Sequence, residues 1–131
     1  MSNAATGVND FTTVSNNIIV NMSNNVGTGG ISLDPTACQP HNIWANNLMY
    51  GNTANFTGNG CSQTGTQTGS NSTTFVNYTG TISGDYHLKA GSTAINNGTT
   101  ACALSGCAPS TDFDGKARPQ GAAIDIGAYE Q

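Results

Sequence analysis

The chain has 131 residues, a formal net charge of −4 and only 8% charged residues, while glycine, asparagine, threonine and serine make up almost half of it. Three lysines and arginines cannot form the basic surface that neutralises a nucleic-acid backbone, so the composition argues against nucleic acid as a partner. No stretch approaches the roughly 18 apolar residues that a membrane span requires. Apolar residues nevertheless reach 36%, which fits a small folded domain better than charge-driven disorder.

Neither end of the sequence carries a targeting signal. Residues 1–4 (MSNA) resemble the scar that tag removal leaves, so we expect the folded part to begin at Ala5. The residues that follow lack the basic and apolar regions of a signal peptide, and no sorting signal follows Glu130. We therefore expect neither a signal peptide nor an anchor within this chain.

Short β-type clusters recur at regular spacing. Residues 15–20 (SNNIIV) are followed 30 residues later by residues 45–50 (ANNLMY), and residues 74–78 (TFVNY) form a third cluster. No window shows the 3.6-residue period of an amphipathic helix. A period of about 30 residues is typical of solenoids, whose short strands stack in register to bury one continuous core. The pattern therefore predicts an all-β fold built from stacked coils.

Paired asparagines precede the apolar residues of the first two clusters. Stacking at this offset places Asn16 and Asn17 below Asn46 and Asn47, so that their amides hydrogen-bond along the stack. Asparagine also tolerates the left-handed backbone of a sharp corner. We therefore interpret these asparagines as structural.

The alternation of side chains along a strand assigns Leu48 and Tyr50 to one buried face. Val76 and Tyr78 continue that face if the third cluster has the same parity, meaning that its side chains alternate between the buried and the exposed face in step with those of the second cluster.

The segment 57–72 consists almost entirely of turn formers and predicts a loop that protrudes from one coil. Its alternating Thr64, Thr66 and Thr68 leave a second interpretation open, in which a flat threonine row matches an ice lattice.

The four cysteines leave three interpretations open. Metal ligation would want pairs two to four residues apart with histidine in support, and only Cys102 and Cys107 are near each other. Two disulfides, Cys38–Cys61 and Cys102–Cys107, would suit an exported, oxidised protein. Four half-buried free thiols are the third interpretation.

Motifs from residue 75 onward resemble the closing part of a family of bacterial surface proteins. Residues 75–77 (FVN), 84–88 (GDYHL) and 90–98 (AGSTAINNG) resemble the last coil of right-handed parallel β-helix, or pectin-lyase-like, proteins. Residues 112–119 (DFDGKARP) and 125–130 (DIGAYE) resemble, in order and spacing, the choice-of-anchor Q domain that closes large exported β-helices.

This resemblance implies a right-handed parallel β-helix of about three coils over residues 5–98, closed by a C-terminal tail over residues 99–131. It also implies an extracellular or bacterial cell-surface location. The chain departs from the family's Gly-Ser-Pro-Ala-Ile-Asp pattern at Thr93 and Asn96, so no role for a carboxylate at that corner follows.

The acidic residues of the tail have two interpretations. Asp112 and Asp114 offer oxygen ligands for Ca²⁺ but lack the rest of an EF-hand loop, and no other cofactor is indicated. The favoured interpretation is structural: Asp114 and Asp125 pair with the cations of the tail, and carboxylates satisfy turn amides as the tail folds over the last coil. The expected tail network comprises Asp112, Asp114, Lys116, Arg118, Asp125 and Glu130.

Catalysis has little support from the residue types. A lyase for uronic-acid polymers needs a lysine or arginine base, and a glycosidase needs two carboxylates across a cleft. The only cations are Lys89, Lys116 and Arg118, and no G-x-S-x-G nucleophile motif occurs. We interpret His41 and His87 as surface histidines and predict no catalytic residue.

Carbohydrate binding fits better, because solenoid flanks present shallow grooves in which sugars stack on aromatic rings and bond to amides. Trp44 is the aromatic residue expected to contact a ligand, with polar support from Asn42, Asn46 and Asn52. The predicted function is a non-catalytic structural and carbohydrate-contact end module of an exported or cell-surface β-helix protein. The alternatives are the terminal part or self-assembling subunit of a polysaccharide lyase or glycosidase, and an ice-binding solenoid.

The first coil has no evident capping helix before it and is expected to expose unpaired strand edges. We expect a symmetric end-to-end homodimer to hide those edges. Polysaccharide is the other expected partner.

Overall fold

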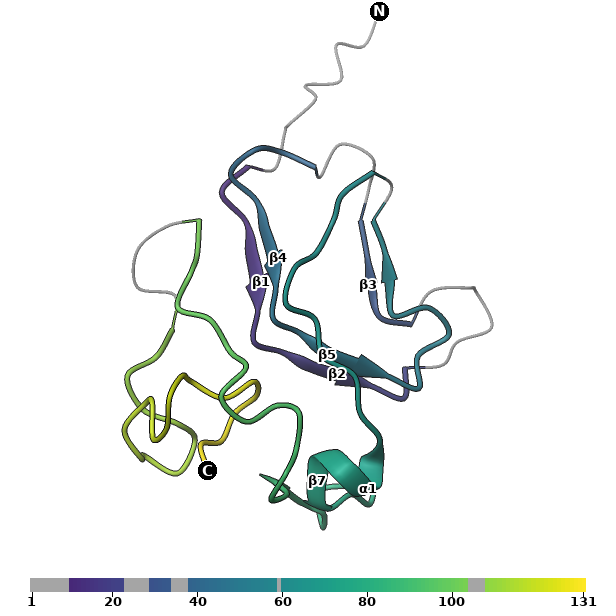
Figure 1. The fold of residues 1–131 in the computed structure, drawn as a ribbon. Helices are drawn as coiled ribbons and strands as arrows, with labels where there is room; N and C mark the ends of the chain where they lie inside the picture. The colour runs from purple at the N-terminus through teal and green to yellow at the C-terminus, as the bar shows by residue number, and fades with distance from the viewer. Residues whose placement is uncertain (1–9, 23–28, 34–37, 59, 104–107) are drawn as a thin grey trace, which may run out of the picture.

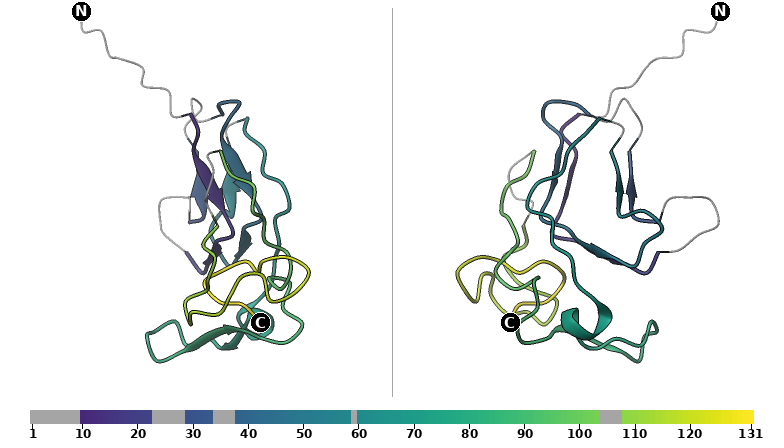
Figure 2. Two further views of the ribbon diagram at one scale, coloured as in Figure 1. Left: turned by 90° about the vertical axis from the view of Figure 1, so that its left-hand side faces the viewer. Right: turned by 45° about the vertical axis from the view of Figure 1, so that its right-hand side comes forward.

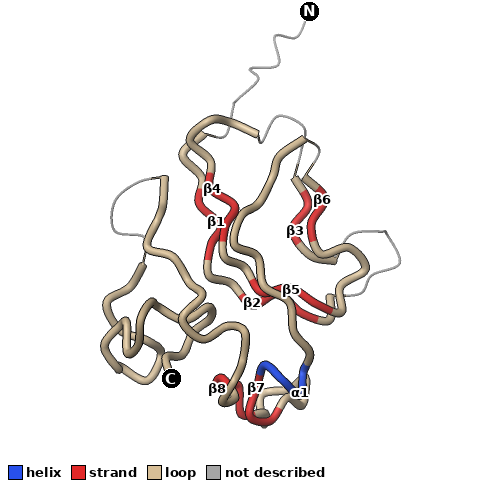
Figure 3. Tube along the Cα trace, in the orientation of Figure 1, coloured by secondary structure: helices blue, strands red, loops and turns tan. Residues whose placement is uncertain are grey.

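The fold is given by a computed structural model that describes residues 10–22, 29–33, 38–58, 60–103 and 108–131 (Figure 1). Within these residues the regular elements are short and only one is helical. They are β1 (Thr13–Ser15), β2 (Ile18–Val20), β3 (Ile31–Ser32), β4 (Ile43–Ala45), β5 (Leu48–Tyr50), β6 (Phe56–Thr57), α1 (Asn71–Thr74), β7 (Phe75–Asn77) and β8 (Asp85–Leu88). The predicted all-β class is confirmed (Figure 3).

Six of the strands form three parallel two-stranded sheets. β1 pairs with β4, and β2 pairs with β5 so that Ile18 lies opposite Leu48. β3 pairs with β6, with Ile31 opposite Phe56. Figure 1 shows β1 and β4 on the left, β2 and β5 below them, and the pair that contains β3 on the right. In the first two pairs, each residue therefore lies opposite the residue 30 positions later, which is the spacing read from the sequence.

Residues in the left-handed backbone region end the short strands. Asn16 and Asn21 follow β1 and β2 with φ of 59° and 56°, and Asn46 and Gly51 follow β4 and β5 with φ of 50° and 65°. Glycine adopts this conformation without steric cost, and asparagine does so more readily than other residues with a side chain. We call β1, β2 and β3 the first layer and their partners β4, β5 and β6 the second layer. The regular placement of these residues turns the chain at equivalent corners in the two layers.

Side-chain amides of the second layer bind the backbone of the first. The Oδ1 atoms of Asn42, Asn47 and Asn52 accept the backbone N–H groups of residues 12, 17 and 22 at 2.7, 3.0 and 2.9 Å. Asn47 is fully buried, and its Nδ2 donates to the carbonyl of Val14 at 3.0 Å. Asn17 Nδ2 lies 3.0 Å from Asn47 Oδ1, so the predicted amide stacking is confirmed for this pair. It is wrong for the other pair, because Asn16 Nδ2 donates to the carbonyl of Thr99 and Asn46 Nδ2 donates to the carbonyl of Asn97.

The segment 57–72, expected as a protruding loop, is paired in its middle with the second layer. Thr64 forms a parallel bridge with Ala45, and Gln67 forms one with Leu48. The backbone N–H of Thr64 also donates to the carbonyl of Trp44 at 3.1 Å. The middle of this segment is therefore held along β4 and β5.

The predicted disulfide between Cys38 and Cys61 is confirmed. Cys107 lies outside the described residues, so the second bridge, Cys102–Cys107, stays a prediction. Residues 1–4, interpreted as the scar of tag removal, also lie outside the described residues.

The third apolar cluster forms a hairpin. β7 pairs antiparallel with β8, with Phe75 opposite Leu88. Phe75 is buried and Val76 is 53% exposed, which reverses the parity expected for this cluster. The physical reason is local, because α1 turns the chain away from β5 and the rings of Phe75, Tyr78 and Tyr86 then pack together with centroids 5.4–5.8 Å apart. Residues 74–78 therefore belong to a hairpin and not to a third parallel coil.

The main core lies between the second strand pair and the C-terminal half of the chain. Its buried members are Leu48, Tyr50, Leu88, Ala94 and Ile126, and Ile18, Val20 and Ile95 pack against them. Figure 2 shows the C-terminal segment beside the strand pairs, and the backbone N–H of Gly127 donates to the carbonyl of Asn16 at 2.9 Å. Leu48 and Tyr50 are therefore buried, and the C-terminal half covers their face. Met49, which lies on the opposite face of β5, is equally buried, so the alternation does not separate a buried face from an exposed one here.

Candidate functional site

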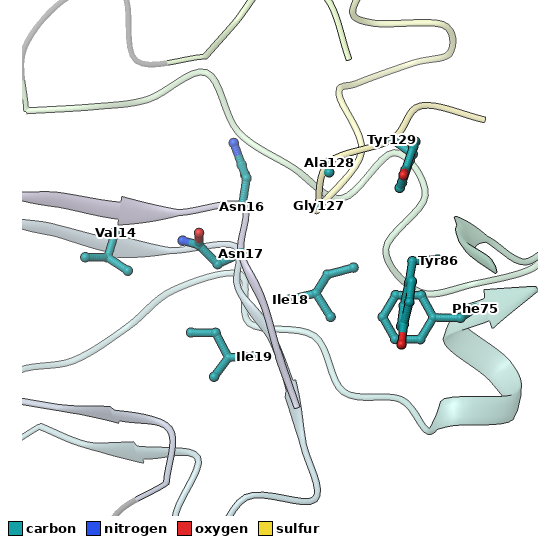
Figure 4. A pocket seen from close by; sticks show the side chains of 10 residues that line it. All are labelled: Val14, Asn16, Asn17, Ile18, Ile19, Phe75, Tyr86, Gly127, Ala128 and Tyr129. Atoms are coloured by element: carbon teal, nitrogen blue, oxygen red, sulfur yellow. The ribbon is translucent and has the colours of Figure 1, made fainter. Parts of the chain in front are cut away.

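A groove of about 630 Å³ lies where the first strand layer meets the hairpin and the C-terminal segment (Figure 4). We call it the tyrosine groove. It is lined by Val14, Asn16, Asn17, Ile18, Ile19, Phe75, Tyr86, Gly127, Ala128 and Tyr129. Its volume lies in the range of small-ligand sites.

The corner residue Asn16 holds one wall of the groove in place. Its left-handed backbone directs the side chain away from the strand pairs, where Nδ2 donates to the carbonyl of Thr99 at 2.7 Å and Oδ1 accepts the N–H of Thr99 at 2.8 Å. Gly127 has a φ of 112°, and a Cβ there would lie 2.8 Å from Ile18 Cδ1. Glycine therefore allows the C-terminal segment to approach β2 closely enough to form the groove.

The aromatic rings of the groove are held by neighbouring contacts. Tyr86 packs edge-on against Phe75 with ring centroids 5.4 Å apart, and its hydroxyl donates to the carbonyl of Thr81 at 2.7 Å. Tyr129 lies against the imidazole of His87, with centroids 4.1 Å apart. Two tyrosines from distant parts of the sequence are thus presented together to one groove.

His87 forms a charged cluster next to Tyr129. Its Nδ1 lies 2.6 Å from Asp85 Oδ1, and its Nε2 lies 2.9 Å from Asp114 Oδ2. The hydrogen bonds to Asp114 and Asp85 raise the pKa of His87, and the bond to His87 lowers the pKa of Asp85. The His87 side chain is 41% exposed, so water screens these interactions. Sequence reasoning missed this cluster, although the Asp-x-His spacing on one strand face was a usable signal.

The residues predicted to bind a ligand do not form one site. Trp44 and Asn42 do line a common groove of about 230 Å³ next to the Cys38–Cys61 disulfide. Asn46 instead donates from Nδ2 to the carbonyl of Asn97 at 2.8 Å. Asn52 Nδ2 donates to the carbonyl of Ile19 at 2.8 Å. The amides of Asn46 and Asn52 are thus used to hold the chain together.

The two aspartates proposed for Ca²⁺ have intramolecular partners. Asp112 is buried, and its carboxylate accepts the backbone N–H groups of Lys116 at 2.8 Å and Glu130 at 2.9 Å. Burial raises the pKa of Asp112, but these backbone amides outweigh it and the pKa lies below its usual value. Asp114 faces His87 and lies 3.8 Å from the Nζ of Lys116. Among the described residues, no group of three or more histidines, cysteines or acidic residues could hold a metal ion.

The remaining tail residues form a buried polar network. Glu130 Oε1 lies 3.3 Å from Arg118 Nε, and their side chains are 0% and 5% exposed. The two carboxylate oxygens of Asp125 accept the N–H groups of Asn96 at 2.7 Å and Gln131 at 2.8 Å, and no cation among the described residues pairs with this carboxylate. The network therefore closes the tail, with Glu130 in the pairing role that the sequence assigned to Asp125.

No helix in the described part of the chain is long and apolar enough to cross a membrane. The chain matches no protein-family model, no curated protein and no solved structure.

Proposed function

We propose that this chain is a non-catalytic, carbohydrate-contacting end module of an exported or cell-surface parallel β-helix protein. The parallel strand pairs, the left-handed corners and the amide stacking support the β-helix part of this proposal. The Cys38–Cys61 disulfide is consistent with an oxidising location.

The observation that carries the carbohydrate function is the tyrosine groove. Tyr86 and Tyr129 both line the groove and are only half-buried, and aromatic rings are the groups on which the apolar faces of sugars stack. Asn17 is exposed at the same groove, and its Oδ1 accepts no hydrogen bond from the described residues. Aromatic surface beside a few polar groups is the usual composition of a small-ligand site.

The contacts of the ionisable groups favour binding over catalysis. Both ring nitrogens of His87 face carboxylates, so the imidazole cannot take a substrate proton without giving up one of these bonds. The Nζ of Lys89 donates to the carbonyl of Ser72 at 2.9 Å, and Lys116 and Arg118 pair with Asp114 and Glu130. Each of the three cations that could act as a lyase base thus has an intramolecular partner.

A polysaccharide-cleaving enzyme is the second candidate, because Asp85 and Asp114 flank one imidazole on an exposed surface. Incubation with uronic-acid and neutral polysaccharides separates the two functions, since cleavage products that disappear in a His87→Gln variant would establish catalysis. The ice-binding alternative has less support, because Ala45 and Leu48, not threonines, lie opposite Thr64 and Gln67 on the neighbouring strands.

The binding proposal is tested by affinity electrophoresis and calorimetry on a panel of polysaccharides. Replacing Tyr129 by alanine removes a stacking surface and is expected to weaken binding about tenfold, equivalent to about 1.4 kcal/mol. Trp44→Ala is the matched control, because it removes the aromatic residue of the other groove. Binding that survives Tyr129→Ala and is lost in Trp44→Ala would move the site to the Trp44 groove and refute the assignment made here.

The end-to-end homodimer is part of the same proposal. β1, β2 and β3 each pair on one side only within the described residues, and such edges favour association. Light scattering across a concentration series should give twice the chain mass of 13.3 kDa. A monomer mass at the highest concentration would contradict the dimer.

A further inference from the structure

The tyrosine groove is lined without charge. None of its ten lining residues carries a carboxylate, an amine, a guanidinium or an imidazole, and its polar side chains are the amides of Asn16 and Asn17 and the hydroxyls of Tyr86 and Tyr129. The amide of Asn16 is already bonded to Thr99. A ligand in the groove therefore meets aromatic rings, aliphatic side chains and the amide of the exposed Asn17.

The lysines and the arginine of the chain are bound within the fold. Arg118 contacts a groove residue but is buried: its side chain is 5% exposed, its Nη2 donates to the carbonyl of Gly127 at 2.7 Å and its Nε lies 3.3 Å from Glu130 Oε1. Lys116 lies beside Asp114 and lines a separate cavity of about 380 Å³ with Val76 and His87. Lys89 lines another cavity and donates to Ser72. A sugar carboxylate in the tyrosine groove would thus lose water contacts without gaining a cationic partner, which is unfavourable.

The charged groups that contact the groove's lining residues are already paired. Tyr129 contacts His87, which lies between Asp85 and Asp114, and Gly127 contacts Arg118, which pairs with Glu130. The chain as a whole carries a net charge of −4, so a polyanion approaches against the field of the protein.

Resting on the proposed carbohydrate function, we infer that the tyrosine groove selects an uncharged polysaccharide and rejects polymers of uronic acids. The apolar faces of the sugar rings lie on Tyr86 and Tyr129, and a sugar hydroxyl donates to Asn17 Oδ1. Selectivity comes from the absence of a counter-charge at this groove, and one added cation at its surface should relax it.

The test compares hexasaccharides of equal length by calorimetry at low salt. The neutral probes are β-1,4-glucan, β-1,3-glucan, β-1,4-mannan and β-1,4-xylan hexamers, and the charged probe is the α-1,4-galacturonate hexamer. We expect the protein to bind at least one neutral hexamer at least tenfold more tightly than the galacturonate hexamer. Ala128→Lys places an ammonium group on an exposed position of the groove and should raise galacturonate affinity at least fivefold, with the gain lost at high salt.

Ala90→Lys is the matched control, since Ala90 is exposed and does not line the groove. Both lysine variants change the net charge equally, so a gain confined to Ala128→Lys assigns the effect to the groove. The selectivity would be overturned if wild type bound the galacturonate hexamer as tightly as every neutral hexamer. It would also be overturned if the two lysine variants gained the same affinity for galacturonate. Either result would leave carbohydrate binding itself intact. Failure to bind any hexamer would refute the proposed function itself.

Discussion

Replacing Asn47 by alanine should remove the contact that best defines the stacked architecture. Asn47 is fully buried, and its amide accepts from the backbone and side chain of Asn17 and donates to the carbonyl of Val14. Alanine leaves the Asn17 N–H and the Val14 carbonyl without these partners. Each unpaired group costs about 1–2 kcal/mol when partly buried, so we expect a loss of about 2–4 kcal/mol in the free energy of unfolding.

Urea unfolding with the disulfide intact, followed by circular dichroism and tyrosine fluorescence, measures this loss. Asn97→Ala is the matched control, because Asn97 is exposed and its amide bonds only locally, to the carbonyl of Ile95 at 2.9 Å. The control should change stability by no more than about 0.5 kcal/mol. A double-mutant cycle with Asn17→Ala should show a coupling of about 0.5 kcal/mol or more, because the two amides are in direct contact. Equal losses for Asn47→Ala and Asn97→Ala would refute the structural role of the stacked amides.

Three further perturbations test other parts of the structure. Glu130→Gln leaves the buried Arg118 without its counter-charge, so the free energy of unfolding measured in urea should fall by about 3 kcal/mol. A loss below about 1 kcal/mol would show that the ion pair is not needed to close the tail. His87 has a folded-state pKa above its unfolded value, so its ion pairs stabilise the fold fully below the unfolded pKa, and this contribution is lost as pH rises through the folded pKa. The melting temperatures of wild type and His87→Gln should therefore converge as the pH rises. The control is His41→Gln, which removes an analogous pair with Asp10 and should leave the contribution of His87 in place. Parallel curves of melting temperature against pH for wild type and His87→Gln would contradict this role. Replacing Cys38 and Cys61 by serine opens a cross-link between residues 23 apart and should cost about 3 kcal/mol in urea unfolding, and unchanged stability would show that the bridge adds nothing to the fold.

Features that depend on local or periodic patterns could be predicted from the sequence. The 30-residue spacing gave the register of β1 with β4 and of β2 with β5, because stacked short strands must align equivalent residues to bury a common core. The position of asparagines at the corners could also be predicted, since few other residues with a side chain adopt a left-handed backbone at low cost. The Cys38–Cys61 bridge was one of three interpretations that the sequence left open for the cysteines, and the folded chain decided between them.

Local patterns also misled where a neighbouring element changed the path of the chain. Residues 74–78 match the earlier clusters in composition, but α1 precedes them and β8 offers a strand partner close in sequence. The hairpin buries Phe75 and exposes Val76, because pairing with β8 decides which face meets the core. Strand parity alone cannot fix that choice, since a shift of one residue inverts it.

The candidate site was decided by tertiary structure. The tyrosine groove brings Asn17, Tyr86 and Tyr129 together only because the C-terminal segment returns to the first strand layer, where Gly127 contacts β2. The His87 cluster likewise depends on Asp114, which lies 27 residues further along the chain. The sequence by itself determined the strand spacing, the corners and the stacking of Asn17 on Asn47, because these follow from a repeat along the chain and from local rules. Contacts between segments that do not repeat depend on how the tail packs, and only the folded chain decides them.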